Sequence, residues 1–181
     1  MSISLNDVIA ILARAAGPVT PFFGLDDMAA ERSELIANSS RELEDILFKL
    51  LQNPPDSSTL QCATQEDFKF ELCGILSEIG RKDSSRFLEL LKPFLDDPKT
   101  RPMAIEIVGG LQDKKGIALL EPFLSIDTLS ENERELLACS LGEIGGKNAA
   151  EILKNMKKNY SQQGHRIAEE IDIALSNIRQ P

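Results

Sequence analysis

The chain has 181 residues, of which 42% are hydrophobic and 27% are charged, and its formal net charge is −9. This length can supply one sizeable core, and this composition is ordinary for a folded globular protein. The acidic balance argues against nucleic-acid binding, which needs a cationic face, and it permits a basic protein partner.

The cysteines and the hydropathy pattern bear on location. Three cysteines, at Cys62, Cys73 and Cys139, are few, odd in number and widely spaced, which favours a reducing compartment over a disulfide framework. The first residues lack the basic region and apolar run of a signal peptide. No apolar stretch approaches the roughly 18 residues needed to span a bilayer. We therefore expect a cytoplasmic protein without a membrane partner.

The N-terminal third predicts three helices, Leu5–Ala16, Asp26–Ala37 and Ser40–Leu51. The first has Asn6 or Asp7 near its start, and Gly17 and Pro18 end it. A loop at 17–24 follows it. The third helix carries a leucine-rich stripe at the spacing of a buried helical face.

Residues 53–59 are the best candidate linker, because two prolines and several polar residues cannot continue a helix. We divide the chain into 1–58, a capping or degenerate repeat of N-terminal helices, and 59–181, a set of repeats with a C-terminal cap helix. We expect the two parts to form one continuous domain.

The remainder of the chain shows helical periodicity and no run of alternating apolar and polar residues, so the predicted class is all-α. Ser84 and Ser130 are expected N-caps, and Ser130 with Glu133 has the spacing of a capping box. The predicted helices are Gln65–Ile79, Ser84–Leu95, Arg101–Leu111, Ile117–Leu124, Ser130–Ile144, Ala149–Lys158 and Gln162–Ile178.

A short phrase occurs three times in this region. It ends at Gly80, Gln112 and Gly145, which are 32 and then 33 residues apart, and such a period indicates stacked supersecondary units. In each unit a first helix and a second helix carry apolar stripes that neither can bury alone. We expect a left-handed glycine at the end of each first helix, and a different or slightly strained turn where Gln112 replaces it. On the first helices the stripes are Leu72, Ile75, Leu76 and Ile79, then Ala104, Ile107, Val108 and Leu111, then Leu137, Ser140, Leu141 and Ile144. On the second helices they are Phe87, Leu88 and Leu91, then Leu119, Leu120 and Phe123, then Ile152, Leu153 and Met156.

The segment Leu141–Leu153, LGEIGGKNAAEIL, resembles a HEAT-like repeat of the short form found in phycobilisome lyase-type proteins. The resemblance covers about residues 68–158. It implies a right-handed α-solenoid of antiparallel helix pairs, a HEAT-like or armadillo-like superhelix. It also implies that the second helices line the concave side.

No constellation of residues predicts chemistry. His165 is the only histidine, so no histidine cluster or paired-cysteine motif indicates a metal, and no strand-turn-helix elbow accompanies a serine or cysteine. We expect Cys73 and Cys139 to be small core residues and Cys62 to lie in a loop. We therefore expect no catalytic residue, no metal and no cofactor, although the question of an enzyme stays open.

Three groups of residues are candidate partner-binding surfaces. Lys82, Lys114 and Lys147 occupy the same register in successive turns and would form a basic edge. Phe22 and Phe23 would form a contact point or fold back over the first helices. The outer face of the second helices would present mixed charge suited to protein recognition, from Arg86, Glu89, Lys92, Glu121, Glu151, Lys154 and Lys157.

These patterns favour a non-enzymatic protein-binding, scaffold or adaptor module whose partner is another protein. The resemblance suggests an alternative, a bilin lyase or lyase-like factor for phycobiliproteins. A third reading is a small acidic immunity or inhibitor protein that neutralises a basic toxin.

Overall fold

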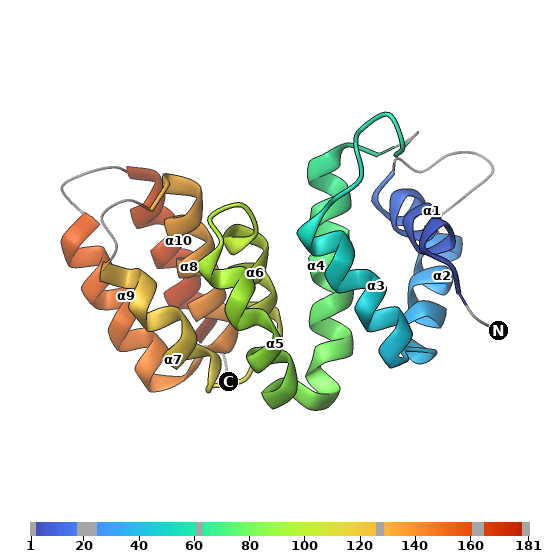
Figure 1. The fold of residues 1–181 in the computed structure, drawn as a ribbon. Helices are drawn as coiled ribbons and strands as arrows, with labels where there is room; N and C mark the ends of the chain where they lie inside the picture. The colour runs from blue at the N-terminus through green and yellow to red at the C-terminus, as the bar shows by residue number, and fades with distance from the viewer. Residues whose placement is uncertain (1–2, 18–24, 61–62, 126–128, 161–164, 179–181) are drawn as a thin grey trace. The chain divides into compact units, whose positions relative to one another are not determined.

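The computed structural model describes residues 3–17, 25–60, 63–125, 129–160 and 165–178. Regular structure in these ranges is helical, with no strand, as the periodicity predicted (Figure 1). The chain forms two compact units, Met1–Ile79 and Gly80–Pro181. Each is described separately below, and the expected division of roles between 1–58 and 59–181 stays a prediction.

The first unit contains helices α1 (Leu5–Ala16), α2 (Leu25–Ala37), α3 (Arg41–Gln52) and α4 (Gln65–Gly80). Helix α1 has the bounds that the sequence predicted, and Ser4 is its N-cap. The Ser4 hydroxyl accepts the Asp7 N–H at 3.3 Å, and the Asp7 carboxylate accepts the Ser4 N–H at 3.1 Å. Asp7, which the sequence placed near the start of the helix, is therefore the reciprocal partner of Ser4 in a capping box.

The leucine stripe of α3 is buried, as predicted. Its buried members are Leu43, Leu47, Leu50 and Leu51. The Ser40 hydroxyl accepts the Leu43 N–H at 3.3 Å and starts the helix. After Gln52 the chain leaves the helix at the proline-containing segment that we predicted as a linker.

The second unit begins with the 3₁₀ turn η1 (Arg81–Asp83). Its helices are α5 (Ser84–Asp96), α6 (Arg101–Gly110), α7 (Gly116–Leu120) with the 3₁₀ turn η2 (Glu121–Ser125), α8 (Glu131–Ile144), α9 (Gly146–Tyr160) and α10 (His165–Ile178). Two expectations were wrong here. Asp83, not Ser84, caps α5 by accepting the Arg86 N–H at 3.3 Å. The helix expected at 117–124 changes to 3₁₀ after Leu120, where Pro122 has no N–H for an α-helical bond.

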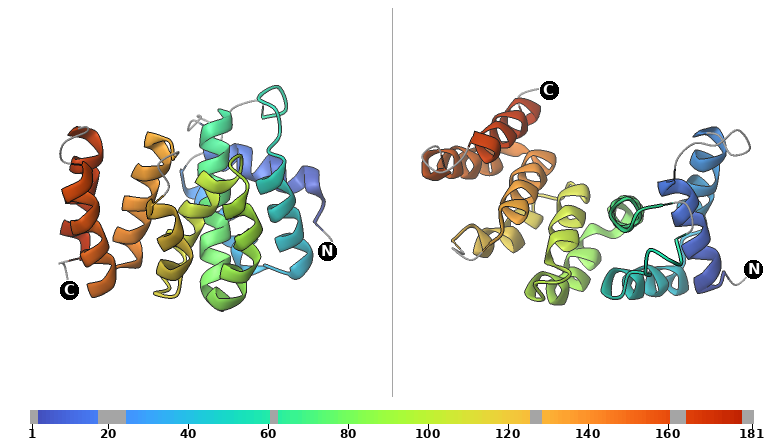
Figure 2. Two further views of the ribbon diagram at one scale, coloured as in Figure 1. Left: turned by 60° about the vertical axis from the view of Figure 1, so that its left-hand side comes forward. Right: turned by 90° about the horizontal axis from the view of Figure 1, so that it is seen from above.

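Within the second unit, α6 packs against α8 and α8 packs against α10, while α9 packs against both α8 and α10. Figure 2 shows these helices side by side in chain order. The stripes of the first helices are buried throughout, including Leu111 and Ile144. On the second helices Leu119 and Ile152 are only half-buried, and Ile117 is buried in addition.

The ends of the first helices differ from one another. Gly145 has a φ of 67°, a left-handed value that favours glycine. Gln112 has a φ of 55° and is the one non-glycine residue with positive φ in the described ranges. This is the strained turn that we expected where glutamine replaces glycine. Gly80 corrects our expectation, because its φ of −66° is right-handed. There the missing side chain leaves room, since a Cβ would lie 2.5 Å from both Leu111 and Phe87.

Two pairs of small residues let neighbouring helices approach closely. A Cβ on Gly109 of α6 would lie 2.6 Å from the Ser140 Cα of α8. A Cβ on Gly142 of α8 would lie 2.8 Å from the Ala174 Cβ of α10. The Ser140 hydroxyl also donates to the Ile105 carbonyl at 2.9 Å. Backbone as well as side chains therefore form the contact between these helices.

An ion pair joins the starts of α6 and α8. Arg101 Nη1 lies 3.3 Å from Glu133 Oε1, and the two side chains are only 15% and 10% exposed. Glu133 also accepts the Ser130 N–H at 2.9 Å in the predicted capping box. Burial alone would raise the pKa of Glu133, but the hydrogen bonds from Ser130 and the charge of Arg101 lower it below 4.5. Glu133 is therefore a structural carboxylate that caps one helix and pairs with the next.

We expect Gly109→Ala to destabilise the protein. Overpacking costs about 1–3 kcal/mol, which exceeds the roughly 1 kcal/mol that alanine gains over glycine inside a helix. Urea denaturation followed by circular dichroism measures the change. Asn132→Ala, on the exposed surface of α8, is the control and should stay within about 0.5 kcal/mol of the parent. An unchanged or raised stability for Gly109→Ala would contradict the close approach.

We expect Glu133→Ala to lower the free energy of unfolding by about 3–5 kcal/mol, because it removes the carboxylate that pairs with the mostly buried Arg101 guanidinium and also removes the capping box of α8. Glu133→Gln should lose less, since glutamine preserves the capping box. Because the folded pKa of Glu133 is lowered, the advantage of the parent over Glu133→Gln is present at neutral pH and lost on acidification through that pKa. Denaturation at several pH values tests this, with exposed Glu131→Ala as the control. If the difference in unfolding free energy between the parent and Glu133→Gln grew toward low pH, the lowered pKa of Glu133 would be contradicted.

Candidate binding surfaces

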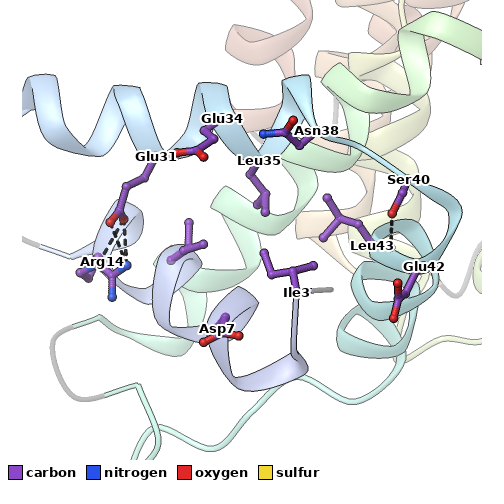
Figure 3. A pocket seen from close by; sticks show the side chains of 11 residues that line it. Ile3, Asp7, Arg14, Glu31, Glu34, Leu35, Asn38, Ser40, Glu42 and Leu43 are labelled. Carbon is purple, nitrogen blue, oxygen red and sulfur yellow. Dashed lines mark hydrogen bonds and ion pairs between the residues drawn. The ribbon is translucent and has the colours of Figure 1, made fainter. Parts of the chain in front are cut away.

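Helices α1, α2 and α3 of the first unit surround a groove of about 680 Å³ (Figure 3). Its lining combines aliphatic side chains with charged and polar ones. The lining residues are Ile3, Asp7, Ile11, Arg14, Glu31, Glu34, Leu35, Asn38, Ser40, Glu42 and Leu43.

The middle of the groove is apolar. Leu35 of α2 and Leu43 of α3 are buried, and Ile3 and Ile11 are half-buried. Figure 3 shows Ile3, Leu35 and Leu43 directed toward one another between the three helices. This floor can accept aliphatic groups from a partner.

The rim of the groove is acidic. Four carboxylates line it, those of Asp7, Glu31, Glu34 and Glu42, against one guanidinium, that of Arg14. Arg14 is paired with Glu31, with its Nη2 2.9 Å from Oε1 and its Nε 3.1 Å from Oε2. Hydrogen bonds from the Ser4 hydroxyl and N–H lower the pKa of Asp7, so that carboxylate is ionised at neutral pH. The lining therefore carries more negative than positive charge.

Sequence reasoning missed this groove. Its residues come from three helices, and no single helix contributes a motif, so only the packing of α1, α2 and α3 reveals the site. The acidic residues on these helices were the one available signal. The predicted contact point at Phe22 and Phe23 lies outside the described residues.

The predicted face of the second helices lies on three elements of the second unit. Glu89, Lys92, Glu121, Glu151 and Lys154 are exposed, and Arg86 and Lys157 are half-buried.

Several of these charges have partners within the chain. Lys92 pairs with Glu89 at 2.5 Å, Lys157 with Asp172 at 2.5 Å, and Arg86 with Asp83 at 3.5 Å. Their role toward a partner stays a prediction.

The turn lysines Lys82, Lys114 and Lys147 are exposed. The turns that carry them are in contact. The Ser84 hydroxyl donates to Asp113 at 2.5 Å, and a Cβ on Gly146 would lie 3.5 Å from the Lys114 Cε. The expected basic edge has a structural basis in these contacts, but its use in binding stays a prediction.

The described residues contain no group of three or more histidine, cysteine, aspartate or glutamate side chains that can hold a metal ion. Of the two cysteines expected in the core, Cys73 is buried, but Cys139 is exposed, so that expectation was wrong. Partial burial and the carboxylate of Glu170 raise the pKa of Cys139 to about 11, which keeps the thiol protonated at neutral pH. Cys62 and the side chain of His165 lie outside the described residues.

Glu71 of α4 is the buried carboxylate that most resembles a catalytic acid. It is 8% exposed, and burial raises its pKa against the opposing charge of Arg32. A perturbed, buried acid is a candidate functional group. Here, however, Arg32 Nη1 of α2 lies 3.3 Å from Glu71 Oε1, and Arg32 also contacts Glu78. The cluster therefore joins α2 to α4 within the first unit.

No helix in the described ranges combines the length and apolarity needed to cross a bilayer. Comparison with protein-family models, curated proteins and solved structures found no match for this chain. The HEAT-like resemblance therefore rests on the repeated residues themselves, and function has to be argued from the surfaces.

We expect Glu71→Gln to fold and to be at least as stable as the parent at pH 7. The raised folded pKa of Glu71 means that ionisation opposes folding, so the parent gains stability relative to the variant as pH falls through that pKa. Denaturation at pH 7 and pH 4.5 measures this difference. The control is Asp45→Asn on the exposed surface of α3. A loss above about 1 kcal/mol at pH 7 would show that the ion pair outweighs the desolvation.

Proposed function

We propose that this protein is a non-enzymatic protein-binding module, a scaffold or adaptor, in which the second unit is an α-solenoid of HEAT-like helix pairs. The partner is another protein. The observation that carries the proposal is a contact that recurs at the period of the sequence repeat.

The recurring contact involves the close approaches described above. Gly109 meets Ser140 between α6 and α8, and Gly142 meets Ala174 between α8 and α10. Gly109 and Gly142 are 33 residues apart, and Ser140 and Ala174 are 34 apart. The same helix face is therefore used at equivalent positions in consecutive units, which is how repeat proteins stack.

Polar contacts follow a similar spacing. Arg101 pairs with Glu133, 32 residues later, and the Arg81 side chain donates to the Gly110 carbonyl at 2.7 Å, 29 residues later. Contacts between neighbouring helices, repeated along the second unit, support a solenoid that leaves its outer helix faces open. Mixed charge on such a face suits recognition by complementarity more than non-specific attraction.

The distribution of buried and exposed charges also favours binding over catalysis. Two buried carboxylates with shifted pKa values are accounted for by ion pairs within the fold, since Glu71 pairs with Arg32 and Glu133 with Arg101. The exposed charges Glu89, Glu121 and Lys154 lie on α5, η2 and α9. We propose that a partner contacts these residues.

We expect charge reversal at Glu89 and Lys154 to weaken partner binding at least tenfold without unfolding the protein. The partner is first captured by crosslinking in cells and identified by mass spectrometry. Its affinity for each variant is then measured by biolayer interferometry, with thermal unfolding checked in parallel. Glu169→Lys, an exposed reversal on α10, is the matched control.

Two outcomes would count against the proposal. Failure to capture any stoichiometric protein partner would contradict the binding role. A partner that binds Glu89→Lys and Lys154→Glu as tightly as the parent would contradict the assignment of this face.

A further inference from the structure

We propose that the groove between α1, α2 and α3 binds a cationic amphipathic helix of a partner protein. The inference rests on the proposed binding function and adds a second surface, in the first unit, with its own specificity. It follows from the shape, the apolar floor and the charge of the groove.

The apolar floor favours a partner that inserts apolar side chains, which we call its anchors. Recognition of a helix in a groove uses residues at i, i+3, i+4 and i+7, all on one face of the bound helix. Ile3 and Ile11, both half-buried, offer aliphatic surface that such anchors would cover. At about 680 Å³, the groove has room for several side chains.

The acidic rim favours a bound helix that carries basic side chains on both sides of its apolar anchors. Glu34 lies on α2, Glu42 on α3 and Asp7 on α1, so the carboxylates come from three directions around the floor. A basic residue flanking the apolar face of a bound helix would meet one of them. An anionic partner would be repelled, and a second copy of this chain would bring a net charge of −9.

Glu34 is the most diagnostic residue of the rim. Asp7 forms the capping box of α1, Glu42 lies in the first turn of α3, and Glu31 pairs with Arg14. Negative charge in a first helical turn is stabilising by itself. Glu34 lies in the last turn of α2, where the helix dipole disfavours a carboxylate, and it forms no ion pair with another described residue. Its charge has no structural use within the described fold.

The test uses three fluorescein-labelled 18-residue peptides. One is a leucine–lysine peptide with its leucines on one helical face, the second has the same composition in scrambled order, and the third replaces lysine with glutamate. Binding to the full chain is followed by fluorescence anisotropy at physiological salt. We expect the first peptide to bind at least tenfold more tightly than the other two.

Variants locate the binding. Glu34→Lys should weaken binding of the amphipathic peptide at least tenfold. Asp45→Lys changes the net charge equally on the exposed surface of α3 outside the groove, so it should bind as the parent does. Methyl NMR should show the resonances of Ile3 and Ile11 shifting with the peptide, with Ile11→Val used to assign the second.

Equal binding of the scrambled peptide, or equal losses in Glu34→Lys and Asp45→Lys, would overturn the proposal, because either shows attraction to net charge alone. Tight binding of the glutamate peptide would overturn it as well. The proposed function can still hold in those cases. It fails separately, by the absence of a protein partner or by the indifference of that partner to Glu89→Lys and Lys154→Glu.

Discussion

The constraint on which the second unit depends is the close approach of helix backbones at small residues. Gly109 against Ser140 and Gly142 against Ala174 leave no space for a further carbon atom. At this separation the stripes of α6 and α8 are buried, as are Ile167, Ile171 and Ala174 of α10. Ser140 also donates to the Ile105 carbonyl. The positions of the intervening turns, and of the charges on α5 and α9, follow from this packing.

The sequence predicted the all-α class and the helices because these signals are local. Helical periodicity and the Ser130 capping box gave the class and most element bounds, since each depends on residues within a turn or two. The errors occur where local chemistry offers two solutions. Ser84 and Asp83 are both good caps, and Gly80, expected to be left-handed, stays right-handed because α4 continues directly into the 3₁₀ turn that begins at Arg81.

The candidate sites were harder to predict. The charges of the second helices and the turn lysines follow the repeat, so a row of equivalent positions could be found without coordinates. The residues that line the groove of the first unit do not belong to the sequence repeat. Ile3, Glu34 and Glu42 become neighbours only through the packing of three helices. Burial of Glu71 and Glu133 could not be anticipated either, because their partners lie 39 and 32 residues away in the chain.

The spacing of contacts in the second unit also bears on how the chain reaches its folded state. The packing of α8 on α6 and of α10 on α8 each closes a loop of about one repeat, so the entropy lost at these two steps is similar and modest. No step has to wait for distant parts of the chain to meet, which favours fast assembly. It also means that α10, with neighbours on one side only among the helices described, is held by fewer contacts than α8 and is the natural place for reversible opening.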